Sequence, residues 1–246
     1  MEFDETRLYQ AGDDIRTIDW RVTARTGKPH TKVFREERER PVFISVDQRA
    51  AMHFATRGVF KSVQAAKLAG LLAWAAEHHG DRIGGQIFTE AMCVELKPHN
   101  GKHAVLRLLN ALATPKANGL ALSYEQILAR LNQHARPGSL VYLISDFRGV
   151  NESAEAYLAK LARHCELVLI FVYDALEAQL PDKGQYRFVD EAREVFVDSA
   201  NNQGLSAYHQ RFQARQEHLQ TLARLHNMRF ILCDTHADPI RCLTAA

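Results

Sequence analysis

The sequence lacks the features that mark several specialised classes of protein. Its four cysteines lie far apart and form no C-x-x-C pair, which argues against zinc knuckles and thiol redox motifs. No apolar run is long enough to span a bilayer, because the most apolar helical stretch, 65–76, is short and contains Lys67. No signal peptide opens the chain. We therefore expect a cytoplasmic protein without direct membrane insertion.

An excess of one charge sign is also missing. The chain has 31 Lys and Arg residues against 29 Asp and Glu, and a net charge of +2 gives no reason to expect nucleic acid as a partner. The charges are concentrated at one end, since 18 of the first 40 residues are charged. This distribution predicts a charged N-terminal segment, residues 1–40, followed by one domain, residues 41–246.

Common catalytic motifs are absent as well. The sequence contains no P-loop, no G-x-G-x-x-G, no G-x-S-x-G and no H-E-x-x-H. His99 and His103 have i, i+4 spacing, but no further ligand pattern accompanies them. Any ATP hydrolysis that this protein depends on must therefore come from another protein.

Residues 41–246 alternate strand patterns with helix patterns. The expected strands are 42–47, 81–88, 92–96, 140–144, 167–173 and 230–232, and the expected helices are 58–79, 101–113, 123–134, 152–164 and 205–226. A polar excursion, 180–199, contains two more short strand candidates. Ser123 gives an N-terminal helix signal without a full capping box. The alternation predicts an α/β fold with a mostly parallel sheet, one antiparallel hairpin at 81–96, and helices on both faces.

Two of the expected buried strands end in a carboxylate, Asp47 and Asp146. Ligands of open α/β sheets bind beyond the carboxyl ends of the strands, and Mg²⁺ takes one or two carboxylates together with waters. The two residues are therefore either half of a magnesium site or caps of the turns that follow the strands.

Several motifs resemble those of the domain of unknown function 58 family. They are G-D-D-I-R-T-I-D-W-R at 12–21, A-R at 24–25, K-V-F-R-E-E at 32–37, G-D-R-I-G at 80–84, I-S-D-F at 144–147 and Y-D-A-L-E at 173–177. The signature residues are Gly12, Asp13, Asp14, Arg16, Asp19, Trp20, Arg21 and Arg25. The resemblance implies a von Willebrand factor A-like domain and a MoxR-type AAA+ ATPase as partner.

The von Willebrand factor A fold often contains a metal-ion-dependent adhesion site with the pattern D-x-S-x-S, a later Thr and a later Asp. Here Asp47 and Asp146 match, but Arg49 and Ala51 replace the two serines and Leu120 replaces the threonine. We therefore expect no metal cofactor, or only weak Mg²⁺ binding. Arg49 either lies between Asp47 and Asp146 in the place of the ion or points into solvent.

The charged segment has three possible roles: a catalytic carboxylate cluster, an ion-pair network or a docking face. Asp13, Asp14 and Asp19 alternate with arginines, which favours ion pairing over catalysis, and we expect Trp20 to pack on the domain. The alternative function is a metal-dependent hydrolase that uses these three carboxylates and Asp47. A scaffold subunit of an envelope-associated complex is a third alternative.

We predict that the chain is a non-enzymatic interaction module, an adaptor or co-chaperone of a MoxR-type ATPase. Its contacts would come from the charged segment and from 47–54 and 146–150, with Met52, Phe54 and Phe147 as apolar anchors or as core residues. Family relatives carry a segment before the stretch that matches Glu2, so this chain is either a short form or starts upstream of Met1. Such a segment, or a partner, would provide any membrane association.

Overall fold

The computed structural model describes residues 2–35, 39–114, 122–180, 184–190, 193–198 and 202–244. The chain divides into two compact units, residues 1–39 and 40–246. Each unit has its own sheet, and each is described separately below.

The first unit is a small antiparallel hairpin with one helix. Strand β1 (Glu2–Leu8) pairs with β2 (His30–Arg35), and α1 (Trp20–Thr26) lies between them in the chain. Helix α1 begins at Asp19, whose carboxylate accepts hydrogen bonds from two backbone N–H groups of the first turn, and ends at Gly27 in the left-handed conformation. The sequence pattern predicts no elements in this segment, because charged residues hide the short alternation of the two strands.

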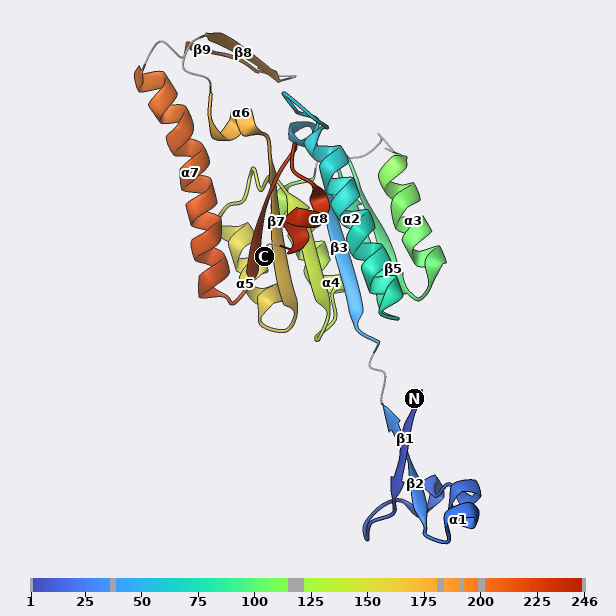
Figure 1. The fold of residues 1–246 in the computed structure, drawn as a ribbon. Helices are drawn as coiled ribbons and strands as arrows, with labels where there is room; N and C mark the ends of the chain where they lie inside the picture. The colour runs from blue at the N-terminus through green and yellow to red at the C-terminus, as the bar shows by residue number, and fades with distance from the viewer. Residues whose placement is uncertain are drawn as a thin grey trace. The chain divides into compact units, whose positions relative to one another are not determined.

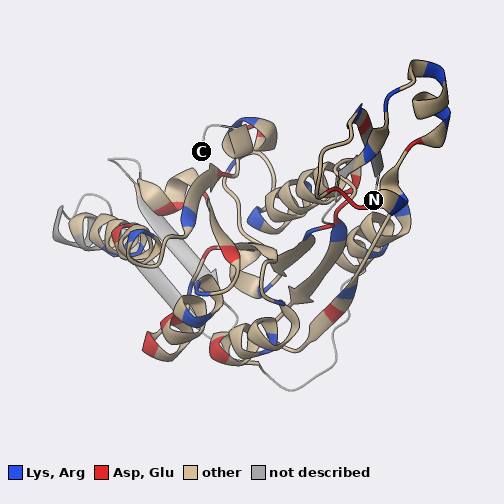
Figure 2. Cartoon of the chain, turned by 90° about the horizontal axis from the view of Figure 1, so that it is seen from below, with Lys and Arg blue, Asp and Glu red and all other residues tan. Residues whose placement is uncertain are grey.

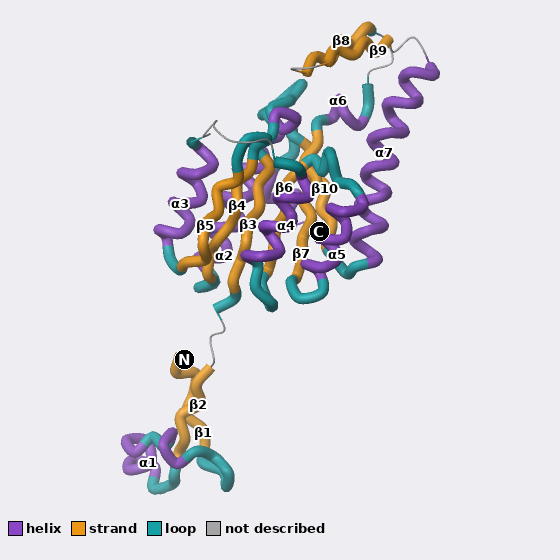
Figure 3. The backbone as a smooth tube through the Cα atoms, turned by 180° about the vertical axis from the view of Figure 1, so that it is seen from behind, coloured by secondary structure: helices purple, strands orange, loops and turns teal. Residues whose placement is uncertain are grey.

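The second unit is built on a six-stranded sheet with the order β10-β7-β6-β3-β4-β5 (Figures 1 and 3). The strands are β3 (Pro41–Asp47), β4 (Arg82–Phe88), β5 (Cys93–His99), β6 (Leu140–Ser145), β7 (Glu166–Tyr173) and β10 (Arg229–Asp234). Only β5 is antiparallel to its neighbour in this sheet. The predicted mostly parallel sheet with one hairpin is confirmed.

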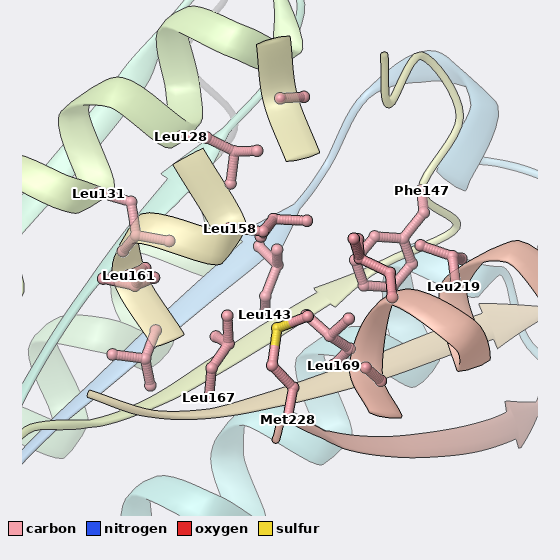
Figure 4. Packing of buried hydrophobic residues seen from close by; sticks show 14 of the residues in the cluster. Leu128, Leu131, Leu143, Phe147, Leu158, Leu161, Leu167, Leu169, Leu219 and Met228 are labelled. Atoms are coloured by element: carbon pink, nitrogen blue, oxygen red, sulfur yellow. The ribbon is translucent and has the colours of Figure 1, made fainter. Parts of the chain in front are cut away.

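Helices cover both faces of this sheet. Residues of α2 (Lys61–His78), α3 (Lys102–Ala113) and α8 (Pro239–Thr244) pack in one hydrophobic cluster, and residues of α4 (Tyr124–His134), α5 (Glu152–Ala162) and α7 (Asn202–Leu225) pack in the other. Figure 4 shows the second cluster, in which Leu143, Leu167 and Leu169 of the strands meet Leu128, Leu131, Leu158 and Leu161 of the helices. Figure 2 shows basic residues interspersed with acidic ones along the surrounding helices, in line with the small net charge.

Alternation along the strands explains why two clusters form. In β7, Leu167, Leu169 and Phe171 enter one cluster, whereas Val168, Ile170 and Val172 enter the other. Successive side chains of a strand point to opposite faces, so a strand that is buried on both faces must be apolar throughout.

The structure corrects several local predictions. Helix α2 begins three residues later than predicted, and α8 and the single-turn helix α6 (Ala175–Ala178) were not predicted. Ser123 does form a full capping box with Gln126, because the residue that returns the hydrogen bond stands three positions after the cap. The two strands of the polar excursion, β8 (Gln185–Asp190) and β9 (Arg193–Asp198), form their own antiparallel sheet. No helix within the described residues is long and apolar enough to cross a membrane.

Candidate functional site: a buried ion network at the carboxyl end of the sheet

The candidate site lies where the strand order reverses. Strands β3 and β6 are neighbours, and their connections run to opposite sides of the sheet, which is the usual position of a binding crevice in such folds. Asp47 ends β3 and Asp146 follows β6, and both residues are almost fully buried. Two carboxylates buried at one point need compensating positive charge.

Arg49 provides the first positive charge. Its Nε lies 3.0 Å and 3.1 Å from the two carboxylate oxygens of Asp47, and its Nη2 lies 2.7 Å from Oδ2. The same Nη2 is 3.8 Å from Asp146 Oδ1, and the guanidinium carbon lies 4.7 Å from the ring centroid of Tyr124. Of the two orientations that the sequence leaves open for Arg49, the structure has the one between the carboxylates.

Lys61 provides the second positive charge, which the sequence pattern does not predict. Its ammonium is fully buried and donates to Asp146 Oδ2 and to Glu177 Oε1, at 2.9 Å each. A cation in the first turn of a helix interacts unfavourably with the helix dipole. The position of Lys61 at the start of α2 was therefore the feature of the sequence that could have indicated a special role for this lysine. Its carboxylate partners come from 85 and 116 residues further along the chain, and local patterns cannot reveal them.

Arg148 completes the network. Its guanidinium donates to Glu177 and has Nε 3.4 Å from Asp146 Oδ2, and about half of its side chain is exposed. Three carboxylates, Asp47, Asp146 and Glu177, thus face three cations. Ser145 adds a hydroxyl that donates to Asp47 Oδ2 at 2.6 Å. We call these residues, Asp47, Arg49, Lys61, Ser145, Asp146, Arg148 and Glu177, the corner network.

The pKa shifts follow from burial and from these contacts. Burial raises the pKa of Asp47, against the opposing effects of the Arg49 guanidinium and the Ser145 hydroxyl. Burial also disfavours the charged form of Asp146, but Lys61 and Arg148 outweigh it and lower the pKa of that carboxyl. Burial disfavours the charged form of Arg49 too, yet its bonds to Asp47 prevail and raise the pKa of the guanidinium. Arg49 therefore keeps its charge at neutral pH.

This arrangement does not fit a divalent metal ion. A Mg²⁺ shell needs carboxylate oxygens that are free to coordinate, together with neutral hydroxyl or water ligands. At Asp47, both oxygens accept hydrogen bonds from Arg49, and at Asp146, Oδ2 accepts from Lys61 and Oδ1 from the Arg148 backbone N–H. Leu120, which replaces the family threonine, lies outside the described residues, and the half-buried Ala51 offers no ligand atom.

A third carboxylate that follows a strand forms hydrogen bonds with the loops around the corner network. Asp174 follows β7 and accepts hydrogen bonds from the Thr56 hydroxyl at 2.6 Å, the Thr235 hydroxyl at 2.8 Å and two backbone N–H groups. Burial opposes ionisation of Asp174, but these bonds prevail and lower its pKa. Since Asp174 and Glu177 together form the capping box of α6, this hydrogen-bonded loop also positions Glu177 for Lys61.

The signature residues of the first unit do not form the predicted network with Arg16, Arg21 and Arg25. Asp13 instead pairs with Arg7, with Oδ1 2.7 Å from Nη2, and Asp14 and Asp19 accept bonds from backbone N–H groups at helix starts. The three predicted arginine partners are exposed, and Gly12 supplies a turn with φ +110°. Asp14 and Asp19 cap helices by accepting from backbone N–H groups, so their carboxylates need no arginine side chain as partner.

The structure also bears on other individual residues. Trp20 does not pack within the first unit, where its side chain is 69% exposed, and its packing on residues 41–246 stays a prediction. Met52 and Phe147 are buried and belong to the core, so they are not anchors for a partner. Among the described residues, no group of three or more His, Cys, Asp or Glu side chains could hold a metal ion. Within the first unit, the carboxylates of the hydrolase alternative are bonded elsewhere, Asp13 to Arg7 and Asp14 and Asp19 to backbone N–H groups.

The fold defines the class of the protein as von Willebrand factor A-like. An aerotolerance-related membrane protein from Bacteroides fragilis matches with a TM-score of 0.54 at 16% identity, covering 83% of this chain and 97% of that one. A von Willebrand factor type A protein from Catenulispora acidiphila matches with a TM-score of 0.50 at 11% identity, covering 88% of this chain and 42% of that one. At these identities the likeness establishes the fold alone.

The family follows from the sequence comparison. The chain belongs to the family described as protein of unknown function DUF58, whose profile matches residues 5–219. The uncharacterized protein Rv1480 of Mycobacterium tuberculosis and an uncharacterized protein of Mycobacterium bovis are each 32% identical over 202 residues. The matched region is 80% of this chain and 63% of each relative, so the match spans less than two thirds of the relatives' length.

The occupied carboxylates predict the response to divalent cations. We expect titration calorimetry with Mg²⁺ and with Mn²⁺ to give no saturable binding at micromolar concentrations, because Arg49 and Lys61 already neutralise the oxygens. Asp47→Ala is the control. Micromolar binding that disappears in Asp47→Ala would contradict the description of the site.

The burial of Lys61 predicts a large effect on stability. Lys61→Met leaves Asp146 and Glu177 buried without their shared cation, and we expect it to lower the free energy of unfolding by roughly 3–5 kcal/mol. Lys67→Met, on the same helix but exposed, should change it by less than about 0.5 kcal/mol. Urea unfolding followed by circular dichroism measures both, and equal effects of the two variants would refute the assigned role of Lys61.

The loss of stability in Lys61→Met should depend on pH in a defined direction. The lowered pKa of Asp146 stabilises the native protein above the ordinary carboxyl pKa of ~3.9, and this stabilisation is lost as pH falls through the lower folded value. In Lys61→Met the lysine no longer lowers the pKa of Asp146, so this stabilisation is reduced. The stability difference from the native protein should therefore be largest near about pH 7 and shrink toward about pH 4.

Proposed function

We propose that this chain is a non-enzymatic protein-interaction module that acts as an adaptor or co-chaperone of a MoxR-type AAA+ ATPase. In this proposal the corner network is a degenerate metal-ion-dependent adhesion site, whose charges serve the fold. The chain works in the cytoplasm, where such an ATPase has access to ATP. Membership of the DUF58 family and the von Willebrand factor A-like fold both support an interaction role.

The proposal rests on one observation: the carboxylates of the corner network are all bonded to cations of the protein itself. A catalytic or metal-dependent site needs a base, a nucleophile or a ligand that is free to react with a substrate. Here the strand-end carboxylates are bonded to Arg49, Lys61 and Arg148. The usual ligand position of the fold is thus internally bonded, which favours binding of a partner through the surface over chemistry at this end of the sheet.

Trp20 marks a surface that fits such a partner. It is 69% exposed at the start of α1, and the signature residues Arg21 and Arg25 are exposed on the same helix. Ile15, 66% exposed, begins the short 3-10 helix Ile15–Thr17 that precedes α1. Tryptophan and arginine are enriched among the residues that dominate binding energy in interfaces. Two exposed apolar side chains of the first unit, Ile15 and Trp20, therefore lie within the signature motif of the family.

The chain has two tryptophans, which provides a matched test. We expect the purified chain to co-elute with a MoxR-type ATPase in at least one nucleotide state, and Trp20→Ala to weaken the affinity about tenfold or more. Trp74→Ala, on the exposed side of α2 in the second unit, should leave the affinity unchanged. Surface plasmon resonance with apo, ADP-bound and ATP-bound ATPase measures all three. Absence of binding in every nucleotide state contradicts the proposal.

A further inference from the structure

One contact between sulfur atoms lies outside the corner network. Cys233, near the end of β10, is fully buried, and its Sγ lies 2.8 Å from the Sγ of Cys242 on α8. A disulfide bond is ~2.05 Å long, so the two atoms are within about 1 Å of bonding distance. The other two cysteines contact oxygen: Cys165 donates to the Arg136 carbonyl and Cys93 to the Gln86 amide oxygen.

We propose that Cys233 and Cys242 form a reversible dithiol–disulfide pair that fastens the C-terminal helix α8 to the edge strand β10. The oxidant is a low-molecular-weight disulfide. The absence of a C-x-x-C motif hides this pair in the sequence, because the two residues are nine positions apart and meet only when α8 folds back on β10.

The surroundings hold the two thiols in place. Helix α8 packs against both α2 and β10, and Cys242 and Leu243 join the hydrophobic cluster of that face. Gln64 of α2 donates through its amide to Cys233 Sγ at 3.5 Å and to the Ala237 carbonyl at 2.8 Å. The Cys242 backbone N–H donates to the Asp238 carbonyl, which closes the first turn of α8.

Exposure assigns the order of the reaction. Cys242 is partly exposed and Cys233 is not, so the Cys242 thiolate attacks one sulfur of the external disulfide and releases its other half as a thiol. Cys233 then loses its proton and attacks the Cys242 sulfur, which releases the second thiol. The two protein thiols lose two electrons and two protons, and the external disulfide gains them. Burial and the contact with Cys242 raise the pKa of Cys233 to about 12, so the second step accelerates as pH rises.

The test uses the purified full chain with oxidised glutathione. After incubation and quenching with iodoacetamide, we expect the intact mass to show the loss of two hydrogens and peptide mapping to join Cys233 to Cys242. Dithiothreitol should reverse the bond. In Cys233→Ser the mixed disulfide should persist on Cys242, because the resolving thiol is missing, and Cys242→Ser should form no internal bond.

Cys165→Ser is the matched control and should form the bond as the native chain does. Oxidation should also raise the melting temperature by several degrees in the native chain, since the bond closes a loop. It should not do so in Cys242→Ser. Failure of the native chain to form the bond, or a bond that involves Cys93 or Cys165, overturns the proposal.

Discussion

The pairing of Arg49 with Asp47 is the interaction on which the site depends. Asp47 is fully buried at the end of the central strand, and an unpaired charge there would cost several kcal/mol. The guanidinium bonds both carboxylate oxygens at once, which gives it a fixed orientation that a lysine would not have. The positive charge that compensates Asp47 is therefore a side chain of the protein itself and does not depend on the concentration of metal ions.

The rest of the corner follows from this first pair. Asp146 lies too far from the Arg49 Nη2, at 3.8 Å, for a short bond, so its charge needs another partner. Lys61 provides it, and Glu177 then shares the lysine with Asp146. Asp174 connects this arrangement to Thr56 and Thr235, which lie in loops after β3 and β10. The segments that follow β3, β6, β7 and β10 are thus joined by hydrogen bonds and ion pairs at one end of the sheet.

The sequence predicts the sheet well because strand and helix periods are local. Apolar runs such as 167–173 need no knowledge of their neighbours, and the positions of Asp47, Arg49 and Asp146 follow from strand ends and family spacing. Lys61 and Glu177 escape prediction because their contacts join positions 85 and 116 residues apart in the chain. In the first unit, Asp14 and Asp19 cap helices whose existence was not predicted, so their partners could not be predicted either.

The central claim is that built-in cations occupy the position where related folds hold a metal ion. The most direct measurement is an anomalous difference map from crystals of the protein grown with Mn²⁺. The account predicts no manganese peak within coordination distance of Asp47 or Asp146, with the Arg49 guanidinium between the two carboxylates. A manganese peak bonded to both carboxylates, with Arg49 turned toward solvent, would contradict it.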